Sequence, residues 1–152
     1  MACDSHGGIA KDGSLPWSKS QLDFKLFKEH TTNQIVVMGS KTWHDPIFPK
    51  PLKNRINVVV SRTHIEKADY SISKNIVSQI EHVQKRYDRD VFIIGGAQLL
   101  TSLLDRVETF YLSQFHQNYH CDTFIQLDQF KDWHLEKEMR YDDFTFKELR
   151  RN

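Results

Sequence analysis

Short apolar runs alternate with amphipathic segments along this chain. Four runs rich in β-branched residues predict β-strands, and they lie at residues 34–39, 56–61, 90–96 and 109–115. Three segments with apolar residues at helical spacing predict α-helices, at residues 20–31, 76–87 and 97–107. Strands that alternate with helices are typical of a parallel sheet with helices packed on both faces.

The C-terminal part of the chain breaks this alternation. The turn-like residues 141–143 precede the segment FTFKEL, residues 144–149, which predicts an antiparallel hairpin strand. Segments 44–55 and 116–131 have no clear period and predict long surface loops. We therefore expect one α/β domain over residues 1–152, with a mostly parallel central sheet, flanking helices and an antiparallel C-terminal hairpin.

Composition narrows the classes of partner. With 152 residues and 39% hydrophobic content, the chain is long enough to bury the core of one domain. The formal net charge is +1, from 21 basic and 20 acidic side chains, so the one-signed field of a nucleic-acid or membrane-surface binder is missing. No stretch approaches the roughly 20 apolar residues of a membrane span. These features favour a cytoplasmic protein with a small-molecule ligand.

Cysteine and histidine spacing predicts neither a disulfide framework nor a metal site. Cys3 and Cys121 fit no CxxC or zinc spacing and indicate reduced thiols in a reducing compartment. The eight histidines are scattered, without paired ligand spacing. We expect no metal.

Two strand ends carry glycine. The strand VFII ends in Gly95-Gly96, directly before a helix, and the strand IVVM ends in Gly39, before Ser40-Lys41-Thr42. Backbone without a Cβ allows a ligand to approach closely, and amides at a helix start bind phosphate. Two such ends favour a dinucleotide, whereas either motif taken alone is more typical of a tight strand-to-helix turn.

A third strand end distinguishes between dinucleotides. Ser61-Arg62 follows the strand INVVV, and a hydroxyl with a guanidinium would bind the extra phosphate that separates NADP from NAD. The alternative is an ordinary surface arginine. Two standard phosphate motifs are absent, because GSKT at 39–42 lacks the glycines of a P-loop and the chain has no GxGxxG.

Asp23 is a candidate ligand-binding carboxylate. It stands beside Phe24 and four residues before Phe27 on a predicted helix that follows Leu15-Pro16-Trp17. A carboxylate against aromatic side chains is costly without polar partners, which makes it a candidate for binding a polar ring. A solvated aspartate at the helix edge is the alternative.

Several of these segments together resemble dihydrofolate reductase. They occur in the family's order: GIAKDGSLPW (8–17), Asp23, Phe24 and Phe27, VMGSKTW (37–43), PLKNRINVVVSR (51–62), IIGGAQ (93–98) and CDTF (121–124). The resemblance implies NADPH-dependent reduction of 7,8-dihydrofolate to 5,6,7,8-tetrahydrofolate, with hydride reaching C6 and protonation at N5. Antifolates would be inhibitors. A riboflavin-pathway reductase has a similar fold but lacks the LPW segment followed by an acid.

The resemblance also assigns roles to individual residues. Asp23 would bind the pterin amino group and N3, with Ser113 as its companion and Trp17 orienting a water, while residues 8–17 would close over the nicotinamide. Substrate would contact Phe24, Phe27, Leu52, Arg55 and Ile94, with Arg55 binding the glutamate carboxylate. Cofactor would contact Ala2, Ile9, Lys41, Thr42, Ser61, Arg62, Gly95, Gly96, Ala97 and Gln98. The Gly95-Gly96 bond would be cis.

The N-terminus departs from the family pattern. A full apolar strand normally precedes the position of Ala2, so the first strand is expected to be truncated and its slot to be filled by upstream residues, a strand from another chain or water. We expect a monomer, with a strand-donating partner as the alternative. An incomplete pocket also leaves a second function open, that of a catalytically impaired remnant that binds nucleotide or folate or serves as an interaction protein.

Overall fold

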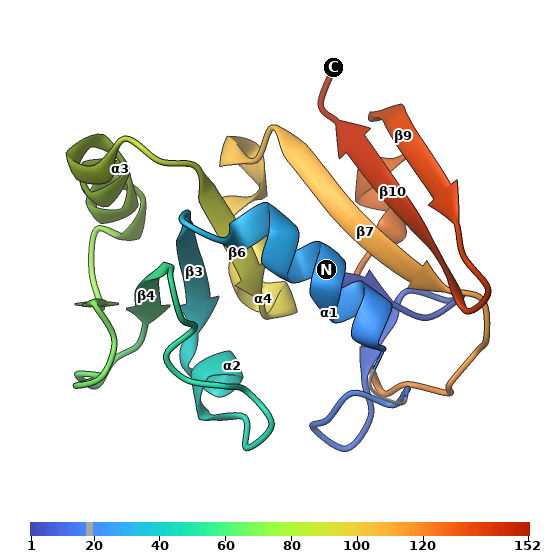
Figure 1. Ribbon diagram of the computed structural model, residues 1–152, viewed down its shortest axis with the longest axis horizontal. Coiled ribbons are helices and arrows are strands. Elements are labelled where there is room, and N and C mark those ends of the chain that lie inside the picture. The colour runs from blue at the N-terminus through green and yellow to red at the C-terminus, as the bar shows by residue number, and fades with distance from the viewer. Residues whose placement is uncertain (18–19) are drawn as a thin grey trace. The chain divides into compact units, whose positions relative to one another are not determined.

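The computed structural model describes residues 1–17 and 20–152, which form two compact units. We call residues 24–103 the continuous unit, and residues 1–23 with 104–152 the discontinuous unit. The predicted α/β class, with a parallel sheet, helices and an antiparallel C-terminal hairpin, is confirmed (Figure 1). Among the described residues, no helix is long and apolar enough to cross a membrane.

The continuous unit is built on a four-stranded parallel sheet. Its strand order is β5-β4-β3-β6, with bounds β3 Ile35–Gly39, β4 Ile56–Val60, β5 Tyr70–Ile72 and β6 Val91–Gly95. Val37 pairs with Val58 of β4 and Met38 with Gly95 of β6, so the carboxyl ends of β3 and β6 lie side by side. Strand β5 was not predicted, because three residues are too few to establish a period.

Side chains from both faces of this sheet are buried. The helices that contribute are α1 Gln21–Thr31, α2 Ser40–His44, α3 Ile76–Tyr87 and α4 Ala97–Leu103. Ile35 and Val37 pack with Ile80 and Val83 of α3, while the alternate positions, such as Val36, pack with Trp43 and Leu52. This alternation is why the strands are almost entirely apolar. The last predicted helix ends at Leu103 and continues as a 3₁₀ turn, Leu104–Arg106.

The discontinuous unit contains a mainly antiparallel sheet. Its order is β1-β7-β10-β9, with bounds β1 Ala2–Cys3, β7 Thr109–Phe115, β9 His134–Arg140 and β10 Phe144–Arg150. Figure 1 shows the β9–β10 hairpin beside β7. Only β1 runs parallel to β7. Thus the strand pairings divide the expected central sheet into one parallel sheet and one hairpin-based sheet, since hairpins connect only antiparallel neighbours.

The predicted 116–131 loop contains two short elements. Strand β8, Thr123–Phe124, pairs with β2, Gly8–Ala10, and a 3₁₀ turn covers Leu127–Phe130. The segment that follows α2 contains a cis peptide bond at Lys50-Pro51. These pairings connect the N-terminal segment to the 116–131 region within the discontinuous unit.

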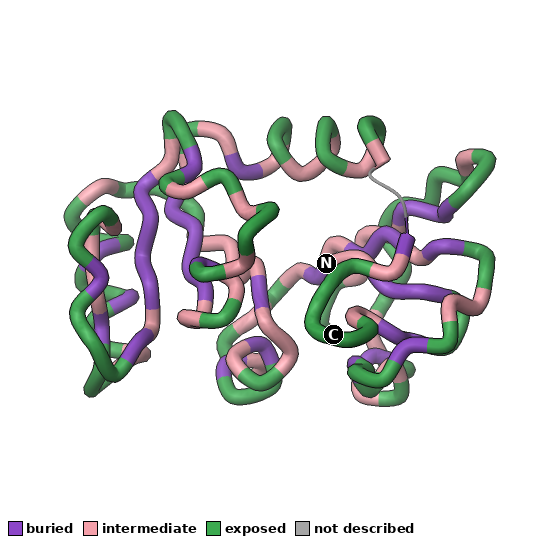
Figure 2. Tube along the Cα trace, turned by 90° about the horizontal axis from the view of Figure 1, so that it is seen from below, coloured by how far each residue is buried: buried purple, intermediate pink, exposed green. Residues whose placement is uncertain are grey.

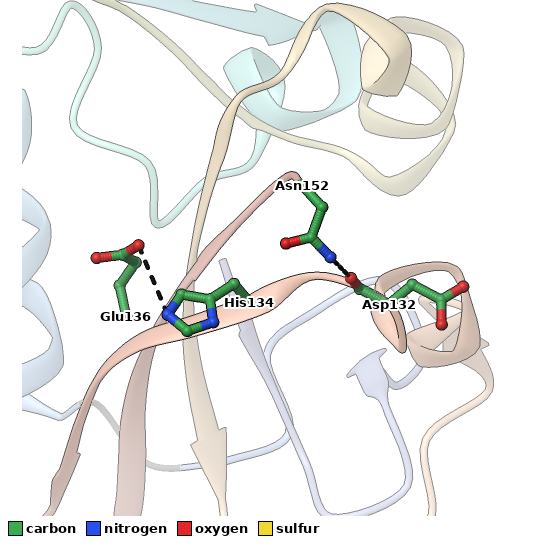
Figure 3. Close-up of polar contacts among 4 residues, drawn as sticks. All are labelled: Asp132, His134, Glu136 and Asn152. Atoms are coloured by element: carbon green, nitrogen blue, oxygen red, sulfur yellow. Dashed lines mark hydrogen bonds and ion pairs between the residues drawn. The ribbon is translucent and has the colours of Figure 1, made fainter.

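Burial follows the strands of both units more than their helices (Figure 2). In α1, Thr31 is the only fully buried residue. All seven residues of β9 are exposed, so the polar contacts of its side chains lie at the surface. Figure 3 shows the 3.8 Å pair of His134 with Glu136 and the contact of Asn152 with the Asp132 carbonyl. Exposed pairs of this kind stabilise a fold only slightly.

Candidate active site

The two glycine-bearing strand ends meet in the continuous unit. A Cβ on Gly39 would lie 3.9 Å from the Gly95 oxygen and 3.9 Å from the Gly96 nitrogen. Gly95 has φ +140°, a conformation that favours glycine, and a Cβ there would approach Thr42 Oγ1 to 3.4 Å. The Gly95-Gly96 peptide bond is cis, as predicted. Gly95 itself is buried, whereas a Cβ on Gly96 would meet no atom within 4 Å, so backbone at the start of α4 is open to a ligand.

A cavity of about 520 Å³ lies at the ends of β4 and β5. Its lining residues are Ser40, His44, Val60, Ser61, Arg62, Thr63, Ser73 and Ile76. The polar members offer hydroxyl, imidazole and guanidinium groups, and none is a carboxylate. This donor set fits a phosphate, which needs hydrogen-bond donors and positive charge. Ser61 and Arg62 were predicted as ligands, whereas Ser40, His44, Thr63 and Ser73 were not.

Backbone contacts hold Ser61 in this cavity. Its N–H donates to the Ile72 carbonyl at 2.9 Å, and its Oγ accepts the Thr63 N–H at 3.2 Å. Ser61 is buried and Arg62 is exposed, so the hydroxyl is fixed while the guanidinium is free to adjust. Lys41 is also exposed, but it is not part of the cavity lining.

A second group of predicted residues surrounds Arg55 in the continuous unit. Its Nη1 donates to Thr31 Oγ1 at 3.1 Å and its Nε donates to the Lys53 carbonyl at 3.0 Å. The Arg55 Cζ atom lies 5.9 Å from the centre of the Phe27 ring. Two of the five guanidinium N–H groups thus have partners among the described residues, which leaves three for a ligand carboxylate. Partial burial lowers the pKa of Arg55, but a guanidinium stays charged in neutral solution.

Apolar residues lie on the same side of the sheet as Phe27. Leu52 is buried in the cluster that also contains Phe27, Phe92 and Ile94. The structure therefore brings together Phe27, Leu52 and Ile94, three of the five residues predicted to contact substrate. Phe24, one turn before Phe27 on α1, has 38% of its surface exposed.

The predicted catalytic residues occupy separate elements of the discontinuous unit. Asp23 lies in the first turn of α1, where its N–H donates to Ser20 Oγ at 3.2 Å as in a helix cap. Trp17 is buried and stacks on Phe115, with ring centres 4.8 Å apart. Ser113 is buried in β7. Among the described residues no hydrogen bond joins Asp23, Trp17 and Ser113.

Two predicted cofactor residues lie in short strands of this unit. Ala2 of β1 is the register partner of Ser113, and Ile9 is the central residue of β2. The β2–β8 pairing connects the segment around Ile9 to Thr123 and Phe124. The other eight predicted cofactor residues belong to the continuous unit.

Asp4 is a buried carboxylate that no sequence pattern predicted. It has 0% exposed surface and accepts the N–H groups of His6 at 2.9 Å, Gly8 at 2.8 Å and Tyr119 at 3.0 Å. Burial alone would raise the pKa of Asp4, but these donors and the Cys121 thiol outweigh it and lower the pKa. The ionised carboxylate therefore ties the segment before residues 8–17 to the loop before β8.

Both cysteines are buried free thiols in the discontinuous unit. Burial raises the pKa of Cys3 to about 12 and also raises the pKa of Cys121, whose thiol lies 3.5 Å from Asp4 Oδ2. Neither thiol is activated as a nucleophile. No group of three or more metal-ligating side chains is found in the described part of the chain.

Comparison with known proteins gives consistent matches. The dihydrofolate reductase family model matches residues 1–151. A dihydrofolate reductase of Ureaplasma parvum is 32% identical over 142 residues, covering 91% of this chain and 86% of its own. Dihydrofolate reductase type 9 of Escherichia coli is 32% identical over 148 residues, covering 91% of this chain and 81% of its own. The bifunctional dihydrofolate reductase-thymidylate synthase of Glycine max is 31% identical and matches 99% of this chain over 33% of its own length.

Proposed function

Because the chain belongs to the dihydrofolate reductase family, we propose that it is an oxidoreductase that reduces 7,8-dihydrofolate to 5,6,7,8-tetrahydrofolate with a nicotinamide cofactor. The observation that carries this proposal is the family match, which runs through residues 1–151 and so includes both compact units. The same match supports treating residues 1–152 as one family domain. The cytoplasmic location and monomeric state stay predictions.

We propose NADPH as the cofactor. The cavity at the ends of β4 and β5 provides Ser61, Arg62 and Thr63 beside Ser40 and His44, without a carboxylate that would repel a phosphate. Arg62 would pair with the 2′-phosphate, and the fixed Ser61 hydroxyl would donate a hydrogen bond to it. Thr42 and the backbone of Gly95, Gly96, Ala97 and Gln98 would hold the remainder, with Lys41 contributing charge.

The tail of the substrate would bind in the continuous unit. Arg55 presents three N–H groups for a carboxylate, and Leu52, Phe27 and Ile94 supply apolar surface for an aromatic ring. Phe24 would pack on the other side of the substrate. A planar guanidinium binds a carboxylate through two parallel hydrogen bonds, so Arg55 suits the glutamate α-carboxylate of dihydrofolate.

Asp23 would bind the polar edge of the pterin. When bound, the cofactor supplies the hydride that reduces C6. A carboxylate at Asp23 would accept hydrogen bonds from the 2-amino group and N3, which favours the protonated pterin. Ser113 would add a hydrogen bond, Trp17 would orient a water, and residues 8–17 with Ala2 and Ile9 would keep bulk water from the nicotinamide.

The test is the loss of reduced-cofactor absorbance when dihydrofolate is added to the protein with NADPH. The proposal predicts dihydrofolate-dependent oxidation that an antifolate abolishes, and a lower rate with NADH at equal concentration. A protein that binds NADPH and dihydrofolate but oxidises none of the cofactor would support the remnant function instead. A protein that binds neither ligand would contradict the reductase function and any remnant function in ligand binding.

A further inference from the structure

Asn57 is a buried amide next to the Arg55 site. It is the second residue of β4, and 1% of its surface is exposed. The Oδ1 atom accepts the Leu52 N–H at 3.0 Å, and Nδ2 donates to the carbonyls of Leu52 at 3.0 Å and Arg55 at 3.1 Å. Both hydrogens of the amide and its oxygen are thus used by one short segment of backbone.

That segment carries two of the residues proposed to bind the substrate tail. It runs from Leu52 to Arg55 between the cis proline and β4. The Asn57 side chain forms hydrogen bonds with both ends of the segment. In the middle of the segment, the Asn54 carbonyl accepts the Asn33 N–H at 2.7 Å. Two of the four residues in the segment, Leu52 and Arg55, are therefore held beside β4 by the side chain of Asn57.

The hold on the segment continues into the Arg55 side chain. Thr31 Oγ1 accepts the Arg55 Nη1 and donates to the Phe27 carbonyl at 2.9 Å. The Arg55 guanidinium therefore has supports on α1 and on its own segment, and a shift of the segment relative to α1 would break its contact with Thr31. Directional binding of a carboxylate requires such fixed geometry, because a misplaced guanidinium loses one of its two parallel hydrogen bonds.

Only an amide satisfies this site. Oδ1 faces a donor and Nδ2 faces two acceptors, so a carboxylate of the same shape would put an oxygen against two carbonyl oxygens. A buried polar group left without a partner is costly, which gives the segment a strong preference for the observed position. The backbone N–H of Asn57 is separately bound to Asp69 Oδ2 at 2.7 Å.

We propose that Asn57 is a positioning residue for substrate selection: its side-chain amide fixes the Leu52–Arg55 segment so that Arg55 binds the carboxylate tail of the substrate. This inference rests on the proposed function, because it assigns the selectivity of the same site. It concerns recognition of the tail and leaves the reduction of the pterin ring unchanged.

The experiment compares two substrates in two variants. Asn57→Asp keeps the shape of the side chain but inverts the polarity of Nδ2, and Asn57→Ala leaves room for water. Turnover is measured with dihydrofolate and with a 7,8-dihydropterin that carries a methyl group in place of the aminobenzoylglutamate tail. We expect KM for dihydrofolate to rise about tenfold in both variants, with kcat and the tail-less substrate little changed.

Asp69→Ala is the matched control. It removes the other hydrogen bond of Asn57 at the start of β4 without touching the side-chain amide, so it tests a purely structural effect. We expect a lower melting temperature and an unchanged ratio of kcat/KM for the two substrates. If the ratio is equally unchanged in Asn57→Asp and Asn57→Ala, Asn57 only stabilises the fold and the proposal is wrong.

A double-mutant cycle with Arg55→Gln identifies the route of the effect. If Asn57 acts through Arg55, adding Asn57→Asp to Arg55→Gln should change the substrate ratio less than about twofold. A full tenfold loss on top of Arg55→Gln would overturn the proposal. The variants are purified with saturating NADPH, which stabilises the folded state, and failure of both variants to fold even then would assign Asn57 to the fold alone.

Failure of the proposed function would be seen separately. Wild-type protein that turns over neither substrate contradicts the reductase activity, whatever the variants do. The affinity for dihydrofolate, measured by quenching of tryptophan fluorescence, still tests Asn57 in that case. Equal affinity of wild type and both variants would overturn the positioning role.

Discussion

The two compact units hold their functional segments by different chemistry. In the continuous unit, neutral and cationic groups do this: Asn57 and Thr31 support the Arg55 region, and the Ser61 hydroxyl is fixed by β5 and Thr63. Among the described residues, Asp69 is the one carboxylate that contributes to these contacts. In the discontinuous unit, the segment leading to residues 8–17 depends on one carboxylate, that of Asp4.

The two kinds of contact should respond differently to pH. Amide, hydroxyl and guanidinium groups keep their charge state over a wide range of pH, so the contacts that Asn57, Thr31 and Arg55 make with one another's segments are retained. Carboxylates that accept backbone N–H groups lose that ability when protonated. We expect the contacts that support Arg55 to be insensitive to acid and the Asp4 contacts of the discontinuous unit to be sensitive.

The largest effect should come from Asp23 in the discontinuous unit. Asp23→Asn keeps the shape of the side chain but removes the charge that complements a protonated pterin, so kcat for dihydrofolate should fall by about a hundredfold or more. NADPH affinity should stay within about twofold of wild type, because the cavity proposed to bind the 2′-phosphate, at the ends of β4 and β5, belongs to the continuous unit. Steady-state turnover at neutral pH measures the first value and fluorescence titration the second. Near-normal turnover would remove Asp23 from the mechanism.

Arg62 tests the continuous unit. Arg62→Gln removes the guanidinium from the cavity at the ends of β4 and β5. The affinity for NADPH should therefore fall about 10- to 100-fold, while the affinity for NADH changes little. Both dissociation constants are obtained by titration of the free protein. Equal losses of affinity for the two cofactors would show that Arg62 does not bind the 2′-phosphate. The charge-matched control is Lys67→Gln, which lies on the exposed loop before β5.

Asp4 tests the carboxylate contacts directly. Asp4→Asn places an NH₂ group against backbone donors, so the free energy of unfolding should fall by about 1–3 kcal/mol. Urea unfolding of wild type and variant measures the difference. Asp122→Asn is the control: Asp122 also accepts a backbone N–H, that of Asp12 at 2.8 Å, but it is exposed, and its loss should leave stability nearly unchanged.

The stabilisation by Asp4 should depend on pH in a defined direction. Because folding lowers the pKa of Asp4, its contribution is complete above the unfolded value of about 3.9 and is lost as pH falls through the lower folded value. The stability gap between wild type and Asp4→Asn should therefore be constant from neutral pH to about pH 5 and then shrink in stronger acid. A gap that widens in acid would contradict an ionised, hydrogen-bonded Asp4.

Helices and strands that are long enough to show a hydrophobic period were predictable from the sequence. The β7 strand, Thr109–Phe115, and the α3 helix, Ile76–Tyr87, have the predicted bounds, because the first is a run of strand-forming residues and the second buries helically spaced Ile80 and Val83. The two glycine strand ends were predicted as parts of a dinucleotide site, and the structure places them side by side at the carboxyl ends of β3 and β6. Strand β5 and the β2–β8 pair are too short to have a recognisable period.

The supports of the sites were not predictable from sequence. Asp4 and Tyr119 are 115 positions apart, and Thr31 and Arg55 are 24 apart, so nothing local marks either pair. His44 is one of eight scattered histidines, and only the cavity distinguishes it. The resemblance to a family assigned roles to residues that are expected to contact ligands, whereas the buried Asn57, which we propose positions one of them, is found only from the three-dimensional contacts.

Transfer of a labelled hydride tests the central claim most directly. Dihydrofolate is incubated with the protein and with NADPH that carries deuterium at the transferred position of the nicotinamide, and the pterin product is analysed by mass spectrometry and NMR. We predict tetrahydrofolate with one deuterium at C6, formed by wild type and greatly reduced with Asp23→Asn. Recovery of unlabelled dihydrofolate from wild-type protein that is folded and saturated with both ligands would contradict the account.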